Sequence, residues 1–220
     1  MSILLFLQFS FALMAPDIMP GTTLPDFELP DHTGVMRRLS LLQGSDPMIV
    51  TLNRGVYCPK DRQQLLELVH FYPQVQVGFA QLVTITTDSL LLSNDLRLGV
   101  GAHWAFLHDE KRVVQHRLDI QEYTDPHNDP MIPHTFVLEP GLKIYKIYNG
   151  YWYWGRPSLA DLHHDLRDIT CRLRPDYKID TPEMQQQWES GNRREFFPYG
   201  QSWHQVFARM AGAVDQYGRS

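Results

Sequence analysis

Cysteine is scarce in this chain of 220 residues, which has only Cys58 and Cys171. Two cysteines are too few for a disulfide framework or a cysteine-rich zinc site. There is no basic run and the formal net charge is −5, which argues against a dedicated nucleic-acid-binding protein. One nearly apolar stretch, residues 3–15, is shorter than the roughly 20 residues that span a bilayer. We therefore expect neither a nucleic-acid partner nor a membrane span.

Three common catalytic signatures are also absent. The sequence has no glycine-rich phosphate loop, no Gly-x-Ser-x-Gly elbow and no His-Glu-x-x-His, so nucleotide binding, serine hydrolysis and metal catalysis have no support. The ten histidines do not change this, since the adjacent His163 and His164 would point about 100° apart on a helix. We expect no cofactor and no metal.

What is present is the composition of an ordinary globular protein. Hydrophobic residues make up 43% of the chain and aromatic residues 12%, which is enough for a core and argues against intrinsic disorder. The pattern predicts three parts: an apolar N-terminal segment over residues 1–20, one domain over residues 21–175, and an aromatic-rich helical extension over residues 176–220.

The N-terminal segment has three interpretations. It has the length of a signal-peptide core, but no Lys or Arg precedes it, and Leu13 stands where cleavage favours a small residue. The other interpretations are a mis-assigned start, with translation beginning at Met14, and a buried N-terminal strand. We expect a cytoplasmic protein, with export through this segment as the alternative.

Strand-like and helix-like stretches alternate from residue 48 onward. The predicted strands are residues 48–52, 79–86, 104–107, 134–138 and 142–148, and the predicted helices are residues 59–73, 90–98, 111–118 and 157–173. Asp88 or Ser89 is expected to cap the second helix. The last two strands form a hairpin across residues 139–141. Such alternation predicts an α/β fold with a central mixed sheet flanked by helices.

The extension over residues 176–220 contains two further helical stretches, around residues 182–189 and 202–210. Its aromatic residues include Trp188, Trp203 and Phe207, which is more aromatic surface than a free tail normally exposes. We favour packing on the main domain or on a second subunit over a ligand-binding role.

Cys58 is the residue whose position carries chemistry. It follows a buried strand and precedes Pro59, a good first-turn residue, so it stands at a helix N-terminus. Helix N–H groups and the helix dipole favour a thiolate there. Arg54 and Lys60 add positive charge and Asp61 opposes them, which leaves the sign of the pKa shift open.

Two features further along the chain suggest what surrounds this thiol. Ile132-Pro133 lies immediately ahead of a predicted strand, and Gly155-Arg156-Pro157 opens the last helix of a strand–strand–helix ending. This arrangement resembles the thioredoxin fold, in which a cis-proline loop, here at Pro133, faces a cysteine at a helix N-terminus.

Four motifs in order make the resemblance more specific. They are Gly21-x-x-Leu24-Pro25-Asp26-Phe27, Arg54-Gly55-x-x-Cys58-Pro59, Ile85-Thr86-Thr87-Asp88-Ser89 and Gly155-Arg156. Over about residues 21–173 the chain is similar to peroxiredoxins of the alkyl hydroperoxide reductase/thiol-specific antioxidant family. The resemblance implies a thioredoxin-like fold, with Cys58 as the thiol that attacks a hydroperoxide and becomes a sulfenic acid. It also makes Arg54 and Arg156 the candidate cationic groups around the peroxide.

Two positions depart from the family pattern. Gly55 stands where these proteins usually carry Thr, and Pro133 stands where their strand arginine is expected. The fourth residue of the Cys-x-x-Cys of thioredoxins is replaced by Asp61. Cys171 lies off the apolar stripe of the last helix. We interpret it as a surface or half-buried cysteine without a redox role rather than as a resolving cysteine.

The sequence therefore predicts a one-cysteine thiol peroxidase that acts on hydrogen peroxide or an organic hydroperoxide. An external thiol, either glutathione or a thioredoxin-like protein, would resolve Cys58, and a homodimer is an open alternative to a monomer. Tyr57, Trp152 and Trp154 are candidates for a substrate or partner surface. Two other functions stay open: a redoxin-fold interaction protein without peroxidase activity, and a monothiol disulfide reductase.

Overall fold

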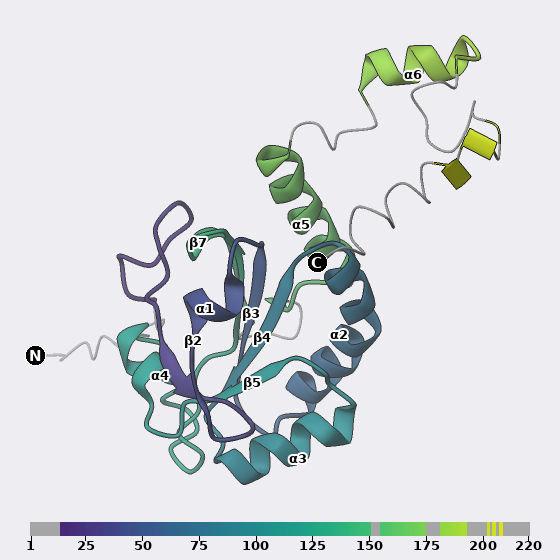
Figure 1. Cartoon of the computed structure of the whole chain (residues 1–220). Helices are drawn as coiled ribbons and strands as arrows, with labels where there is room; N and C mark the ends of the chain where they lie inside the picture. Colours follow the sequence, from purple (N-terminus) through teal and green to yellow (C-terminus); the bar gives the residue numbers. More distant parts are fainter. Residues whose placement is uncertain are drawn as a thin grey trace, which may run out of the picture. The chain divides into compact units, whose positions relative to one another are not determined.

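The computed structural model describes residues 14–150, 155–174 and 181–192, together with residues 202, 204, 205, 207 and 208. The chain divides into two compact units, Met1–Thr170 and Cys171–Ser220. Its elements, drawn in Figure 1, are β1 (Glu28–Pro30), β2 (Met36–Arg38), α1 (Leu39–Gln43), β3 (Met48–Asn53), α2 (Pro59–Val77), β4 (Gln81–Thr86), α3 (Leu90–Val100), β5 (Ala105–His108), α4 (Val113–Arg117), β6 (His134–Glu139), β7 (Lys143–Asn149), α5 (Leu159–Leu173) and α6 (Pro182–Glu189). None of the helices in these described stretches combines the length and the apolar character that a membrane crossing requires.

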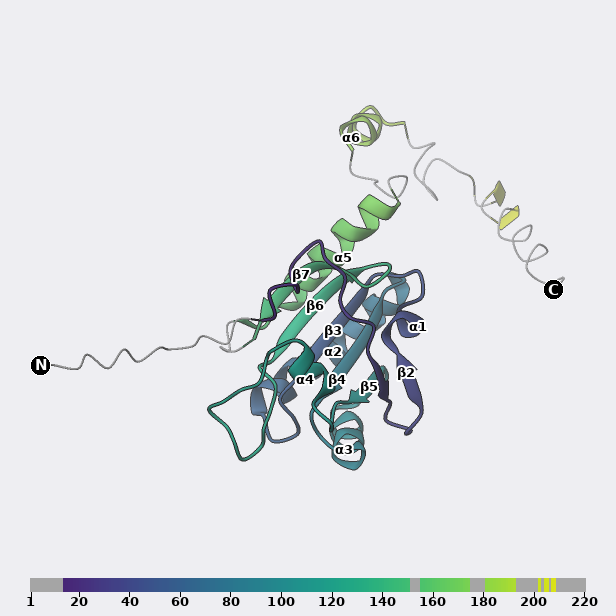
Figure 2. The same cartoon turned by 90° about the vertical axis from the view of Figure 1, so that its left-hand side faces the viewer.

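A five-stranded mixed sheet forms the centre of the first unit. Its strand order is β5-β4-β3-β6-β7, with β3, β4 and β5 parallel and β6 and β7 antiparallel to their neighbours. Figure 2 shows these strands side by side. The predicted α/β class and mixed sheet are confirmed. Because β3, β4 and β5 are parallel, their C-terminal ends meet at one edge of the sheet, and the loop that carries Cys58 starts there.

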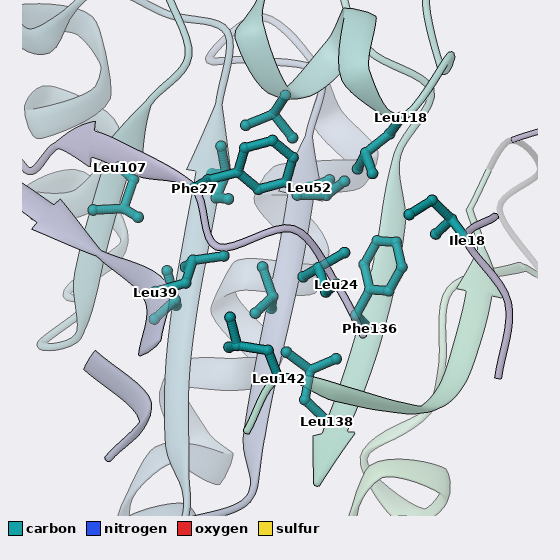
Figure 3. Packing of buried hydrophobic residues seen from close by; sticks show 14 of the residues in the cluster. Ile18, Leu24, Phe27, Leu39, Leu52, Leu107, Leu118, Phe136, Leu138 and Leu142 are labelled. Atoms are coloured by element: carbon teal, nitrogen blue, oxygen red, sulfur yellow. The ribbon is translucent and has the colours of Figure 1, made fainter. Parts of the chain in front are cut away.

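One apolar cluster covers each face of the sheet. On one face residues 14–29, α1 and α4 pack on β3 and β6; Figure 3 shows Leu24 and Phe27 lying over Leu52 and Phe136. On the other face α2, α3 and α5 pack through residues that include Leu65, Leu96, Leu162, Leu166 and Ile169. Fully burying such a side chain contributes about 1.5–3 kcal/mol, so both helix layers are firmly held.

Three local expectations differ from the structure. The helix expected to stop at Pro73 continues to Val77, because Pro73 lacks only one donor while Val75 beyond it is buried in the core. The strand expected from Phe79 begins at Gln81, since Phe79 takes a positive φ of 50° and stays exposed. Ser89 occupies the N-cap of α3 without a side-chain hydrogen bond.

In the second unit, α6 begins at the predicted position. Thr181 caps it by accepting a hydrogen bond from the Met184 N–H at 3.2 Å, and Pro182 takes the first helical position. No residue of α6 is buried. The packing role expected for the aromatic extension stays a prediction.

Candidate active site around Cys58

Cys58 occupies the N-cap of α2, at the end of a short loop over residues 54–58 that we call the cysteine loop. The buried strand β3 ends at Asn53, and Pro59 starts the helix with a φ that suits its first turn. The Cys58 N–H donates to the Gly55 carbonyl at 3.0 Å, which closes the loop on itself. Only 3% of Cys58 is exposed, so the thiol lies at the predicted junction but beneath the surface.

Burial raises the pKa of the Cys58 thiol above its ordinary value, and the negative charge of Asp61 raises it further. The N–H groups of Asp61 and Lys60 and the guanidinium of Arg156 oppose the rise. The sulfur caps no helix N–H with normal hydrogen-bond geometry, which limits what the helix N-terminus contributes. In this closed conformation the protonated thiol is therefore favoured.

A buried ion pair lies beneath the thiol. Asp61 has no exposed surface and pairs with Arg156, whose side chain is 8% exposed. The second Asp61 oxygen accepts from the Arg54 N–H at 2.6 Å, and Arg156 also donates to the Gly150 carbonyl. Burial raises the pKa of Asp61, and Arg156 opposes this by stabilising the carboxylate. Asp61 thus connects Arg54, at the start of the cysteine loop, to Arg156, which lies just before α5.

Two glycines let Arg156 reach this position. A Cβ on Gly155 would collide with the Asn149 carbonyl, and a Cβ on Gly150 would lie 2.7 Å from an Arg156 nitrogen. The Gly150 N–H donates to the Pro133 carbonyl at 2.7 Å. A chain of hydrogen bonds through Gly150, Arg156 and Asp61 thus connects Pro133 to the Cys58 site.

Arg54 is held by acidic residues of a different loop. Its Nε lies 2.9 Å from a Glu122 oxygen, and its Nη2 lies 3.4 Å from an Asp125 oxygen. The Tyr57 hydroxyl donates to Asp125 at 3.1 Å, and the Arg54 guanidinium lies 5.7 Å from the Tyr57 ring centre. The charge of Arg54 is thus balanced by two carboxylates.

The structure brings some of the predicted site residues together and not others. Cys58, Arg54, Arg156 and Tyr57 lie around the cysteine loop, while Trp152 and Trp154 lie outside the described residues. Cys58 and Cys171 are both free thiols, and Cys171 is the first residue of the second unit. The catalytic roles of the two arginines and the cis-proline role of Pro133 stay predictions.

Sequence reasoning missed four polar residues of the site. No sequence pattern marked Glu122 and Asp125, because they lie in an irregular loop about 70 residues along the chain from the cysteine loop. Asp88 was expected as a helix cap and instead bonds the cysteine loop. His134 is buried at the start of β6, where desolvation lowers its pKa to about 4, so this imidazole is neutral at pH 7.

No metal site emerges from the described part of the chain, where no three His, Cys, Asp or Glu side chains are grouped to hold an ion. The chemistry available there is that of one buried thiol beside a paired carboxylate and guanidinium.

Comparisons with known proteins give the family and the fold. The model of the AhpC/TSA family matches residues 20–147. The fold is similar to that of the peroxidoxin BcpB from Mycobacterium tuberculosis, with 22% identity, a TM-score of 0.60, and coverage of 69% of this chain and 96% of that one. AhpC from Enterococcus faecalis has 13% identity and a TM-score of 0.60, covering 72% and 95%.

A third similar structure is a yeast mitochondrial 1-Cys peroxiredoxin, with 13% identity, a TM-score of 0.58, and coverage of 72% of this chain and 78% of that one. No curated protein matches the chain at a significant level. The family model spans more than half of the 220 residues and includes the cysteine loop, and the similar structures share the mixed sheet. The chain belongs to the AhpC/TSA family and is a peroxiredoxin-like thiol oxidoreductase with a thioredoxin-like fold.

Proposed function

We propose that the protein reduces hydrogen peroxide or an organic hydroperoxide through Cys58 alone, with an external thiol completing the cycle. The observation that supports this most directly is the place of Cys58 at the N-terminus of α2, beside the buried Asp61–Arg156 pair. A helix N-terminus and a guanidinium both stabilise negative charge, which develops on sulfur and then on oxygen during the reaction.

The proposed cycle needs the Cys58 thiol, the hydroperoxide and two equivalents of the external thiol. The Cys58 thiolate attacks the terminal oxygen of ROOH, the S–O bond forms, the O–O bond breaks, and RO⁻ takes up the proton that the thiol released. The sulfur is oxidised by two electrons to a sulfenic acid and the peroxide is reduced to ROH. An external thiol then displaces water to form a mixed disulfide, and a second thiol releases Cys58 as its thiol again.

The external thiol is part of the proposal because the chain offers only Cys171 as an internal one. In the yeast mitochondrial 1-Cys peroxiredoxin, the thiol is resolved through glutathione and thioredoxin systems. By analogy we propose glutathione or a thioredoxin-like protein here. A homodimer and a cytoplasmic location, with export as its alternative, complete the proposal.

Intact mass spectrometry tests the proposal. Reduced wild type, Cys58→Ser and Cys171→Ser would each receive less than one equivalent of hydrogen peroxide with a sulfenic-acid trap. We expect one trap adduct in wild type and Cys171→Ser and none in Cys58→Ser. Turnover with glutathione that persists in Cys171→Ser supports resolution by an external thiol, whereas its loss in that variant contradicts the one-cysteine cycle.

A second function is favoured by a specific observation. Cys58 is 3% exposed with a raised pKa, and both arginines form ion pairs with carboxylates, which suits a redoxin-fold interaction protein without peroxidase activity. No trap adduct in wild type at pH 7 or pH 9 would favour this function. A monothiol disulfide reductase, in contrast, would reduce a mixed disulfide substrate while giving no adduct with peroxide.

A further inference from the structure

Gly55 lies at the position where the family pattern has Thr, and the structure explains the glycine. Its φ is +133°, a backbone conformation that residues with a side chain rarely adopt. A Cβ at this position would lie 2.7 Å from the Oδ1 atom of Asp88 and 3.2 Å from its Cγ atom. The volume that a side chain at position 55 would need is therefore filled by the Asp88 carboxyl.

The Asp88 carboxyl is also bonded to the cysteine loop. Its Oδ2 atom accepts from the Val56 N–H at 2.8 Å and from the Thr86 hydroxyl at 2.7 Å. Thr86 is fully buried at the end of β4, so the carboxyl is anchored to the sheet on one side and to the loop on the other.

This contact reaches Cys58 through the backbone. Gly55 and Val56 touch Asp88, and the Gly55 carbonyl accepts from the Cys58 N–H at 3.0 Å. The Thr87 hydroxyl adds a bond to the Arg54 carbonyl at 2.9 Å from the same β4–α3 connection. Three consecutive residues of the cysteine loop, Arg54 to Val56, are thus held against the end of β4.

We infer that Asp88 is the positioning residue of the cysteine loop, its carboxyl holding the loop against the end of β4 and keeping Cys58 covered. Gly55 and Asp88 then form one unit: the glycine leaves the space, and the carboxyl fills it and fixes the loop. The inference deepens the proposed function, since it concerns the same thiol. It accounts for the glycine at position 55, where a side chain would collide with the Asp88 carboxyl.

Alkylation of Cys58 by iodoacetamide tests this unit without any peroxide chemistry. The rate constant at pH 8 would be measured in a Cys171→Ser background for Asp88→Ala, Gly55→Thr and the double variant. We expect each single change to open the loop and to raise the alkylation rate about tenfold. The rate of the double variant should equal that of a single variant, and the two increases should not multiply. Rates that multiply, or single variants that react like wild type, would overturn the inference.

Controls separate positioning from general destabilisation. Asp88→Asn keeps the shape and an acceptor oxygen, so its rate should stay within about threefold of wild type. Asp26→Ala removes a carboxylate with a similar pair of donors, the Ser40 N–H at 2.9 Å and hydroxyl at 2.7 Å, and should not change the rate. Gly55→Ala replaces Gly55→Thr if the latter does not fold.

The pH profile provides a further readout. Opening the loop exposes the thiol, so the midpoint of the alkylation profile should fall in Asp88→Ala towards that of free cysteine and stay at the wild-type value in Asp88→Asn. A midpoint that stays at the wild-type value in Asp88→Ala contradicts the inference. If wild type gives no sulfenic adduct while these alkylation results hold, the proposed function fails and the positioning role of Asp88 stands.

Discussion

Arg156→Gln isolates the buried ion pair on which the candidate site rests. The substitution removes the cation from Asp61, which has no exposed surface and keeps the Arg54 N–H as a hydrogen-bond donor. Removing one partner of a buried ion pair costs about 3–5 kcal/mol, because the remaining charge stays desolvated. At about 2–4 °C per kcal/mol for a protein of this size, the unfolding midpoint should fall by about 6–20 °C.

The pH dependence gives the sign of the effect. Without Arg156 the folded-state pKa of Asp61 rises farther above the unfolded value of about 3.9. A folded state that binds a proton more tightly than the unfolded chain loses stability as pH rises through its pKa. The free energy of unfolding of Arg156→Gln should therefore fall farthest below that of wild type at pH 7, and the difference should become smaller as the pH is lowered towards 4.

Urea denaturation followed by circular dichroism measures this deficit at both pH values. Asp61→Asn combined with Arg156→Gln should recover part of the loss, because no charge then stays buried. Arg38→Gln removes an exposed pair with Glu28 at 3.0 Å and should leave the midpoint unchanged. A deficit below about 1 kcal/mol at pH 7, or one that is equal at both pH values, would refute the reasoning.

The structure leads to three further expected outcomes. The alkylation rate of Cys58 should increase with pH with a midpoint above the 8.5 or so of free cysteine, because burial raises its pKa; a midpoint below 8 would contradict this. Asp165→Ala removes a buried acceptor of two side chains from β7 and should lower the free energy of unfolding in urea by about 1–3 kcal/mol; no loss would show that these bonds do not hold α5. Gly155→Ala should lower the free energy of unfolding by about 1–3 kcal/mol, because the added Cβ collides with the Asn149 carbonyl. Gly99→Ala places its Cβ in open space and should not lower this free energy. Equal effects of the two changes would contradict the collision.

Local patterns were sufficient to predict the order of elements from β3 to α6, but not β1, β2 and α1. The β-branched run of β3, the hairpin of β6 and β7 and the apolar stripe of α5 each involve residues close together in the chain, so periodicity and turn residues report on them directly. The same holds for Cys58, which Pro59 places at a helix start. Where the local signal competed with the core, as at Pro73, burial of Val75 decided the outcome.

The contacts that define the site are of a different kind. Arg156 and Asp61 are 95 residues apart, Arg54 and Asp125 are 71 apart, and Val56 and Asp88 are 32 apart. Each depends on which strands are neighbours and in what register, and nothing in a single sequence specifies that a carboxylate in one loop meets a backbone N–H in another. Asp88 for this reason was predicted only as a cap for its own helix.

Propensity and spacing act over a few residues, so the sequence was enough to predict the α/β fold and the cysteine at a helix N-terminus. The glycine–arginine pair was recognised through its resemblance to the family. How these residues are used depends on the tertiary structure. It covers Cys58, so that desolvation outweighs the helix N-terminus and raises the pKa of the thiol. It pairs both arginines with carboxylates and sets Asp88 in the space beside Gly55, since charge balance and packing are settled only when distant segments meet.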